Sequence, residues 1–186
     1  MIRRALGYLS DIRKAWFSLD RRGVAAVEFA LILPVMLLIY FGGVEIMQAV
    51  TVNRLVTLAA TTVTNLVAQY TTISATTQMP DVLNASTQVL APYSSTSAKI
   101  VVSCITIDSH GSASVTWSQT LNGTALTAGQ TVTVPAALDV PNTSLILGQV
   151  TYAYSPAFDF MKVGPFNLIS KVYMSPRAST TVNLAP

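Results

Sequence analysis

The stretch Arg21-Arg22-Gly23-Val24-Ala25-Ala26-Val27-Glu28-Phe29 decides the fold that we expect for the N-terminal part of the chain. A basic pair and a glycine lead into an apolar segment that carries one carboxylate, Glu28, near its start. Residues 29–44 contain no charged residue, and with residues 24–27 they approach the roughly 20 apolar residues that a membrane-spanning helix needs. The stretch therefore predicts a transmembrane helix over residues 24–46. An ionised carboxylate costs about 2 to 3 kcal/mol near the centre of a bilayer and less near its rim, so we expect Glu28 to have a partner.

The basic charge of the chain is concentrated before this helix. Of the 11 lysines and arginines, six precede Gly23, among them Arg21 and Arg22, whereas the residues after Gly23 carry five basic and six acidic side chains. Basic residues beside an apolar segment keep that end in the cytoplasm, so residues 1–23 are predicted to be a basic cytoplasmic leader and the C-terminal region to be periplasmic. This distribution of charge indicates how the chain is oriented in the membrane, and it does not indicate a nucleic-acid-binding surface. A cleavable secretory signal is the weaker alternative, because its apolar region is typically about 7 to 15 residues long.

The order of residues in this stretch also resembles a known processing site. A basic leader, Gly23 and a glutamate at the fifth position after the glycine resemble the prepilins of the type IV filament superfamily. Glu28-Phe29, the following Ala30-Leu31-Ile32-Leu33-Pro34 and the later Phe41-Gly42-Gly43-Val44-Glu45 look most like the TadE branch, the pseudopilins of tight-adherence (Flp) pilus systems. The resemblance covers residues 21–65. Flp major pilins are shorter and carry Glu-Tyr at this point, so Phe29 and the long C-terminal region point to a minor subunit.

The resemblance implies a role for each residue of the motif. A prepilin peptidase would cut after Gly23, and Val24 would then gain a free α-amino group. Glu28 lies four residues further on, on the same helix face, and would neutralise the amine of its own or a neighbouring subunit. The alternative is a Glu28 that stays at the membrane rim and reaches the lipid headgroups.

Two further residues mark features of the predicted membrane helix. Pro34 lacks an N–H and its ring clashes with the carbonyl of Ala30, so a kink or a locally opened turn is expected there. Glu45 lies 17 residues after Glu28, about 25 Å along a helix, and is therefore expected near the opposite face of the membrane.

Residues 47–79 predict a continuation of the helix outside the membrane. Apolar residues recur at steps of three and four from Val52 to Tyr70, and no glycine or proline interrupts this region, whose last part, residues 71–78, is expected to be a loop. A shorter helix is expected over residues 80–90.

The remaining residues, 80–186, predict a head domain that contains a β-sheet. Asn122-Gly123 is expected to form a hairpin turn. An antiparallel sheet packed on the long helix would bury the apolar stripe of that helix. The predicted fold class is α+β: a long N-terminal transmembrane and amphipathic helix packed on a C-terminal antiparallel sheet, an arrangement that resembles the pilins. Five segments rich in Val, Ile, Thr and Tyr predict the strands: 98–107, 113–120, 130–134, 145–154 and 168–174.

Residues with catalytic or metal-binding chemistry are scarce. His110 is the one histidine and Cys104 the one cysteine, so neither a catalytic triad nor a zinc site is expected. We expect no cofactor and no enzymatic activity. Cys104 stands in an apolar segment and is expected to be buried rather than joined to another chain.

The sequence therefore predicts a TadE-like minor pilin or pseudopilin in the bacterial inner membrane, with a cytoplasmic N-terminus and a periplasmic head. The resemblance implies four partners, namely a prepilin peptidase, other pilins, the inner-membrane assembly platform and membrane lipid, and it implies cell adhesion as the process. Two alternatives stay open: an uncleaved bitopic periplasmic binding or scaffold protein, and a membrane-tethered hydrolase.

Overall fold

The computed structural model of the chain describes residues 21–156 and 165–186. All but the last three residues of the predicted leader lie outside the described residues. The chain divides into two compact units, Met1–Ile46 and Met47–Pro186, and helix α2 (Arg21–Ala68) contributes to both.

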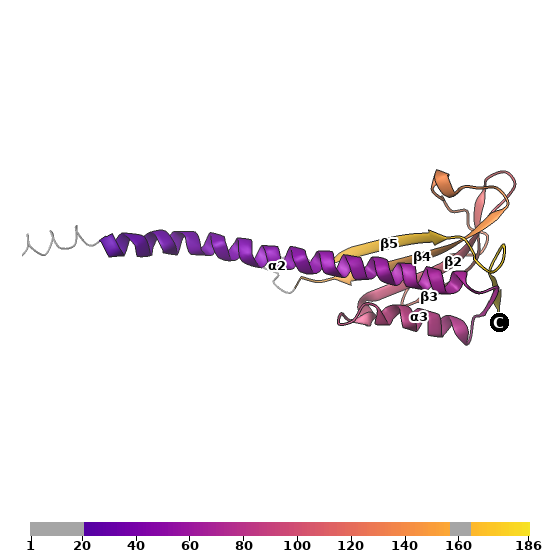
Figure 1. Cartoon of the computed structure of the whole chain (residues 1–186), viewed down its shortest axis with the longest axis horizontal. Helices are drawn as coiled ribbons and strands as arrows, with labels where there is room; N and C mark the ends of the chain where they lie inside the picture. Colours follow the sequence, from indigo (N-terminus) through magenta and orange to yellow (C-terminus); the bar gives the residue numbers. More distant parts are fainter. Residues whose placement is uncertain (1–20, 157–164) are drawn as a thin grey trace, which may run out of the picture. The chain divides into compact units, whose positions relative to one another are not determined.

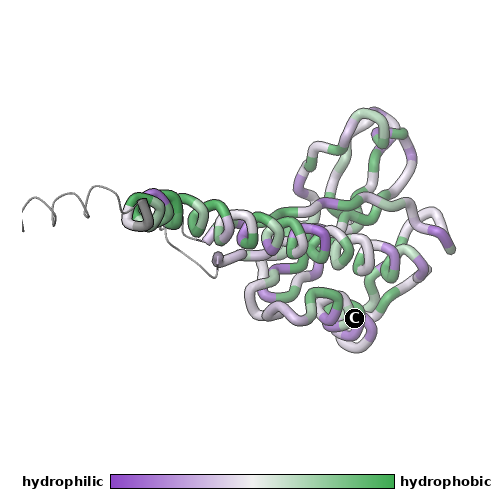
Figure 2. Tube along the Cα trace, turned by 60° about the vertical axis from the view of Figure 1, so that its left-hand side comes forward, coloured by the Kyte–Doolittle hydropathy of each residue, from purple (hydrophilic) through white to green (hydrophobic). Residues whose placement is uncertain are grey.

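The first part of α2 exposes apolar side chains in every direction. Val24, Phe29, Leu31 and Ile39 are between 58% and 72% exposed, and Figure 2 shows this part of the helix as largely hydrophobic. Among the described residues, α2 is the one helix that is long and apolar enough to span a membrane. So large an apolar surface marks a membrane or protein contact, because soluble monomers rarely expose one.

The second unit contains a four-stranded antiparallel sheet. Its strand order is β3-β2-β4-β5, and the strands contain the β-branched and aromatic residues that favour a pleated, half-buried surface. Their bounds are β2 (Ala98–Ile107), β3 (Ala113–Leu121), β4 (Thr143–Tyr154) and β5 (Phe166–Met174). Four of the five predicted strands are thus present, with ends that shift by at most two residues.

Two expectations for the segment between β3 and β4 are wrong. Residues 130–134 form no strand: Thr131 makes an isolated bridge to Ser114, and Pro135, which has no N–H to donate, follows directly and precedes η2. Asn122-Gly123 forms no two-residue hairpin. Asn122 has a φ of 56°, but Gly123 is not among the residues with positive φ, whereas a type I′ turn needs positive φ at both positions.

The core lies between the second half of α2 and one face of the sheet, as Figure 1 shows. Val52, Val56 and Val63 of α2 are at most 1% exposed, and they join one apolar cluster with residues of β2 and β4. The apolar stripe of this helix is buried as predicted, and the predicted packing of the helix on an antiparallel sheet is confirmed. Helix α3 (Gln78–Gln88) adds Met79 and Leu83 to the same cluster.

A second apolar cluster lies on the opposite face of the sheet. It is built from Ile105 and Ile107 of β2 and Leu145 and Leu147 of β4, together with Ala113. Three residues of the long connection between β3 and β4 cover it, Val132, Val134 and Leu138, the last from the short 3-10 helix η2 (Ala136–Leu138). A second 3-10 turn, η1 (Ser95–Ser97), precedes β2.

The C-terminal residues return to the end of α2. The short strands β1 (Thr72–Ser74) and β6 (Asn183–Ala185) pair in parallel, although residues 71–78 were expected to be a loop. The Arg177 N–H donates to the Ala68 carbonyl at 2.8 Å, and Trp117 Nε1 donates to the Val182 carbonyl at 2.7 Å. These bonds fix the end of α2 and the sheet to the C-terminal segment.

Candidate functional site

The candidate site is the first part of α2, which carries the residues of the predicted processing motif. Val24 is 58% exposed and Phe29 60% exposed, and Glu28 is exposed between them. Residues four apart in a helix lie on one face, so α2 places Glu28 one turn from Val24, about 6 Å along the axis.

Gly23 has no packing role within the described chain. A Cβ placed on it would meet no heavy atom within 4 Å, and its φ is not in the left-handed region. Glycine nevertheless costs about 1 kcal/mol in a helix relative to alanine. No contact among the described residues therefore requires a glycine at this position.

Glu28 is the one charged side chain of residues 24–44. Within the part of the chain that the structure describes, no hydrogen bond or ion pair reaches its carboxylate. Its neighbours on α2 are exposed apolar side chains such as Val27, Leu31 and Ile32. In an apolar surrounding an ionised carboxylate is costly unless a cation lies beside it.

Pro34 and Glu45 lie in the same helix. α2 continues through Pro34 without interruption, although the proline leaves the carbonyl of Ala30 without its usual donor. Glu45 is partly buried and precedes the boundary between the two units, at Ile46, by one residue.

Comparison with protein families finds a match for most of this helix. Residues 23–64 match the family model described as TadE-like protein. The chain carries a TadE-like segment. The match begins at Gly23 and ends four residues before the end of α2, so it confirms the predicted resemblance for the helix and includes none of the sheet. Comparison with curated proteins gives no match, and comparison with solved structures gives none.

The described residues contain no group of three or more His, Cys, Asp and Glu side chains that could hold a metal ion. His110 lies exposed in a turn, where its backbone N–H donates to Asp108 Oδ1 at 2.8 Å. Backbone N–H donors from Ser112 and His110 lower the pKa of Asp108 below its usual value. These bonds explain the turn and need no ligand.

Cys104 is buried in β2, as the sequence predicted. Burial raises the pKa of its thiol, and the nearby Thr181 Oγ1, 3.6 Å from Sγ, opposes the shift in part. A thiol with a raised pKa is a poor nucleophile at neutral pH.

One close contact between the TadE-like helix and the sheet was not predicted from the sequence. Gly148 of β4 lies directly under α2, where a Cβ would overlap Thr64 Oγ1 and would lie 3.0 Å from the Ala60 carbonyl oxygen. A glycine inside a predicted strand is a signal of close backbone approach, and it could have been read here.

Proposed function

We propose that this TadE-like chain is a minor pilin or pseudopilin of a tight-adherence (Flp-type) pilus, a structural component and not an enzyme. The observation that carries the proposal is the coincidence of the family match with one helix. The match of residues 23–64 supports a role in the tight-adherence pilus system, and it covers the apolar part of α2 that would lie in lipid or among other subunits.

A prepilin peptidase would process the chain after Gly23. The open space around Gly23 supports this, because no contact within the described part of the chain requires a glycine there. A peptidase pocket that accepts only a small residue would supply a reason for the glycine. Cleavage would leave residues 24–186, with Val24 at the new amino terminus.

The pairing of Glu28 with the amine of Val24 would then control assembly. An amine and a carboxylate that are each costly in lipid become one ion pair when they meet across two subunits or within one. A subunit packed in the wrong register leaves both charges unpaired. The penalty for breaking a buried pair is about 3 to 5 kcal/mol, which is enough to select the correct register.

The topology follows from the charges at the two ends of the membrane helix. Arg21 and Arg22 would stay in the cytoplasm, Glu45 would mark the exit from the inner membrane, and the sheet would lie in the periplasm. The partners of the chain would be the peptidase, membrane lipid, the other pilins and the inner-membrane assembly platform.

The test is a Glu28→Gln variant, which removes the charge and keeps the size of the side chain. We expect normal membrane insertion, normal cleavage and a loss of piliation of tenfold or more, measured by counting pili and by sedimenting sheared filaments. Glu28→Asp is the matched control, because it keeps the charge and should retain part of the function. Normal piliation of the Glu28→Gln strain would refute the pairing mechanism.

A further inference from the structure

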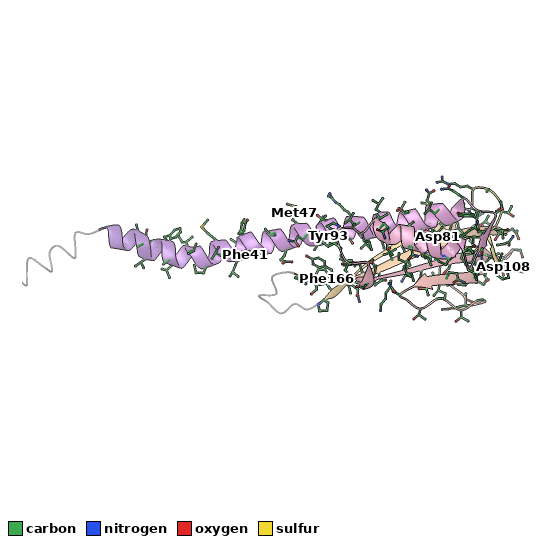
Figure 3. All side chains as sticks on the ribbon, turned by 90° about the horizontal axis from the view of Figure 1, so that it is seen from below. Phe41, Met47, Asp81, Tyr93, Asp108 and Phe166 are labelled. Carbon is green, nitrogen blue, oxygen red and sulfur yellow. The ribbon has the colours of Figure 1, made fainter. Side chains whose placement is uncertain are left out.

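Large apolar side chains gather at the end of the second unit, the head, where α2 enters it. Met47 is 71% exposed, and Val50, one turn further along α2, is 45% exposed. Phe166 of β5 is 38% exposed although its ring centroid lies 5.2 Å from that of Tyr154. Tyr93 is half-buried against the core, and Figure 3 shows it toward the same end of the head as Met47 and Phe166. We call Met47, Val50, Tyr93 and Phe166 the entry end.

The packing of α2 on the sheet places these residues at one level. Gly148 of β4 lies under residues 60–64 of α2, and β4 runs antiparallel to the helix (Figure 1). Tyr154 follows Gly148 by six residues, or about 20 Å along the strand, which equals about 13 residues of helix. Tyr154 therefore lies near the level of Ala49, and both belong to the same apolar cluster. Phe166 is the partner of Tyr154 in the strand register, so it lies at that level as well.

The chain itself holds the entry end close to the membrane segment. The uncharged apolar run of α2 ends at Val44, and Met47 follows three residues later, or about 4.5 Å along a helix. The headgroup layer on each side of the hydrocarbon core is about 5 to 7 Å thick. A bilayer that holds the apolar run therefore has its headgroups beside Met47, whatever the angle between the two units.

The chemistry of the entry end suits a headgroup layer. Tyrosine is enriched at the boundary between lipid and water, because its ring is apolar and its hydroxyl is polar. Of the exposed basic residues in the described head, Arg54 and Lys99 lie nearest the entry end, whereas Arg177 lies at the far end. The described carboxylates of the head lie toward the far end: Asp81, Asp108 and Asp139 (Figure 3). An anionic membrane would attract the entry end and repel the far end over about one Debye length.

We infer that the entry end of the head rests in the headgroup layer of the membrane that α2 crosses, with Met47, Tyr93 and Phe166 at the boundary with the acyl chains. The occupant is lipid, because the chain keeps the headgroups within reach of this end and the charges of the head favour an anionic surface. The inference rests on the membrane span of the proposed function and is independent of cleavage after Gly23. The contact would hold the head in one orientation on the membrane.

The test measures the depth of a nitroxide spin label on the full chain in vesicles of phosphatidylcholine and phosphatidylglycerol. A cysteine at Ala91 carries the label, because Ala91 is exposed, lies two residues before Tyr93 and leaves the aromatic residues in place. Ala137 of η2 is the matched control, an exposed alanine at the far end of the head. Cys104 is buried, and a sample without an added cysteine measures its labelling. Oxygen collects in lipid and a nickel chelate stays in water, so we expect the ratio of their collision rates with the label to be several-fold higher at position 91 than at position 137.

Substitutions in β5 decide whether the entry end makes the contact. Phe166→Ser should lower the ratio at position 91 toward that at position 137, because it removes an apolar side chain from the lipid boundary. Ile169→Ser is the matched control on the same strand, since Ile169 lies outside the entry end and is 56% exposed, and it should leave the ratio unchanged. Protease resistance of each variant verifies that the head is folded.

Three results would overturn the inference. The first is a ratio at position 91 equal to that at position 137, and the second is a ratio that Phe166→Ser leaves unchanged. The third is a low collision rate with both reagents at position 91, because it would show that protein covers the entry end in place of lipid.

A label at Ile39 in the same vesicles separates this inference from the proposed function. Ile39 is 71% exposed and lies in the apolar part of α2. A lipid-like ratio at position 39 with a water-like ratio at position 91 would refute the contact of the head and leave the proposed function intact. A water-like ratio at position 39 would refute the membrane span and both proposals with it. Lipid-like ratios at both positions, in a chain that a prepilin peptidase leaves uncut, would support the contact and refute the pilus assignment.

Discussion

Gly148→Ala is the substitution whose effect the structure defines best. The added methyl group would overlap Thr64 Oγ1 and would lie 3.0 Å from both the Ala60 carbonyl oxygen and Val63 Cγ1. Thr64 is fully buried and donates to the Ala60 carbonyl at 2.6 Å, so its side chain has no free space into which to rotate. The Ala60 oxygen belongs to the backbone of α2 and moves only with the helix.

The magnitude follows from two costs. Overpacking of a core by a methyl group costs typically 1 to 3 kcal/mol, and loss of the Thr64 hydrogen bond adds about 1 kcal/mol. We therefore expect Gly148→Ala to lower the free energy of unfolding of the head by about 3 kcal/mol. For a chain of this size that corresponds to a fall in Tm of roughly 6 to 12 °C.

A double-mutant cycle tests this reasoning. Urea unfolding of the full chain in a mild detergent, followed by circular dichroism, gives the free energies. Thr64→Ala removes the atom with which the new methyl group overlaps, so Gly148→Ala should cost about 1.5 kcal/mol less in that background. Thr64→Val keeps a group of the same size but has no hydrogen bond to lose, so the relief in that background should not exceed about 1 kcal/mol. Gly43→Ala is the control for the substitution itself, because a Cβ at Gly43 meets no heavy atom within 4 Å. A Gly148→Ala head as stable as the parent, or equal effects in all three Thr64 backgrounds, would show that α2 does not approach β4 so closely.

Three further predictions concern the head. Trp117→Phe removes the donor to the buried Val182 carbonyl, and we expect it to cost about 2 kcal/mol in the same urea titration; a loss below the error of the measurement would mean that the C-terminal segment is not held there. Cys104 should react with dithionitrobenzoate at pH 8 only after unfolding, because burial raises the pKa of its thiol, and rapid reaction of the folded protein would contradict its placement. Backbone donors hold the pKa of Asp108 below its usual value, so its contribution to stability is complete above about pH 4 and is lost as the pH falls through the lowered pKa. A carboxyl titration followed by NMR should give a pKa below that of an unstructured aspartate, and an ordinary value would exclude the two hydrogen bonds.

The long helix and most strands could be predicted because their patterns are local. The steps of three and four from Val52 onwards define the buried stripe of α2, and the run from Ala98 to Ile107 has the bounds of β2. The TadE-like resemblance could be predicted because the residues that carry it, from Gly23 to Glu45, lie close together in the sequence.

Other features depend on contacts between distant residues. The strands β1 and β6 have three residues each and form because the C-terminal segment returns to the end of α2. Composition also favoured a strand over residues 130–134, but the sheet edge holds this segment at one bridge only. Lys99 and Lys171 are 72 positions apart, and only the register of β2, β4 and β5 brings them to one face.

The central claim is that this chain is a processed pilus subunit, and the N-terminus of the membrane-extracted protein tests it most directly. The intact mass and N-terminal sequence would be measured after expression with and without a prepilin peptidase from a tight-adherence system. Cleavage that depends on the peptidase and yields a chain beginning at Val24 is the result that we predict. A chain that stays uncut in the presence of the peptidase, or one that begins near Val50 after ordinary signal cleavage, would contradict the assignment.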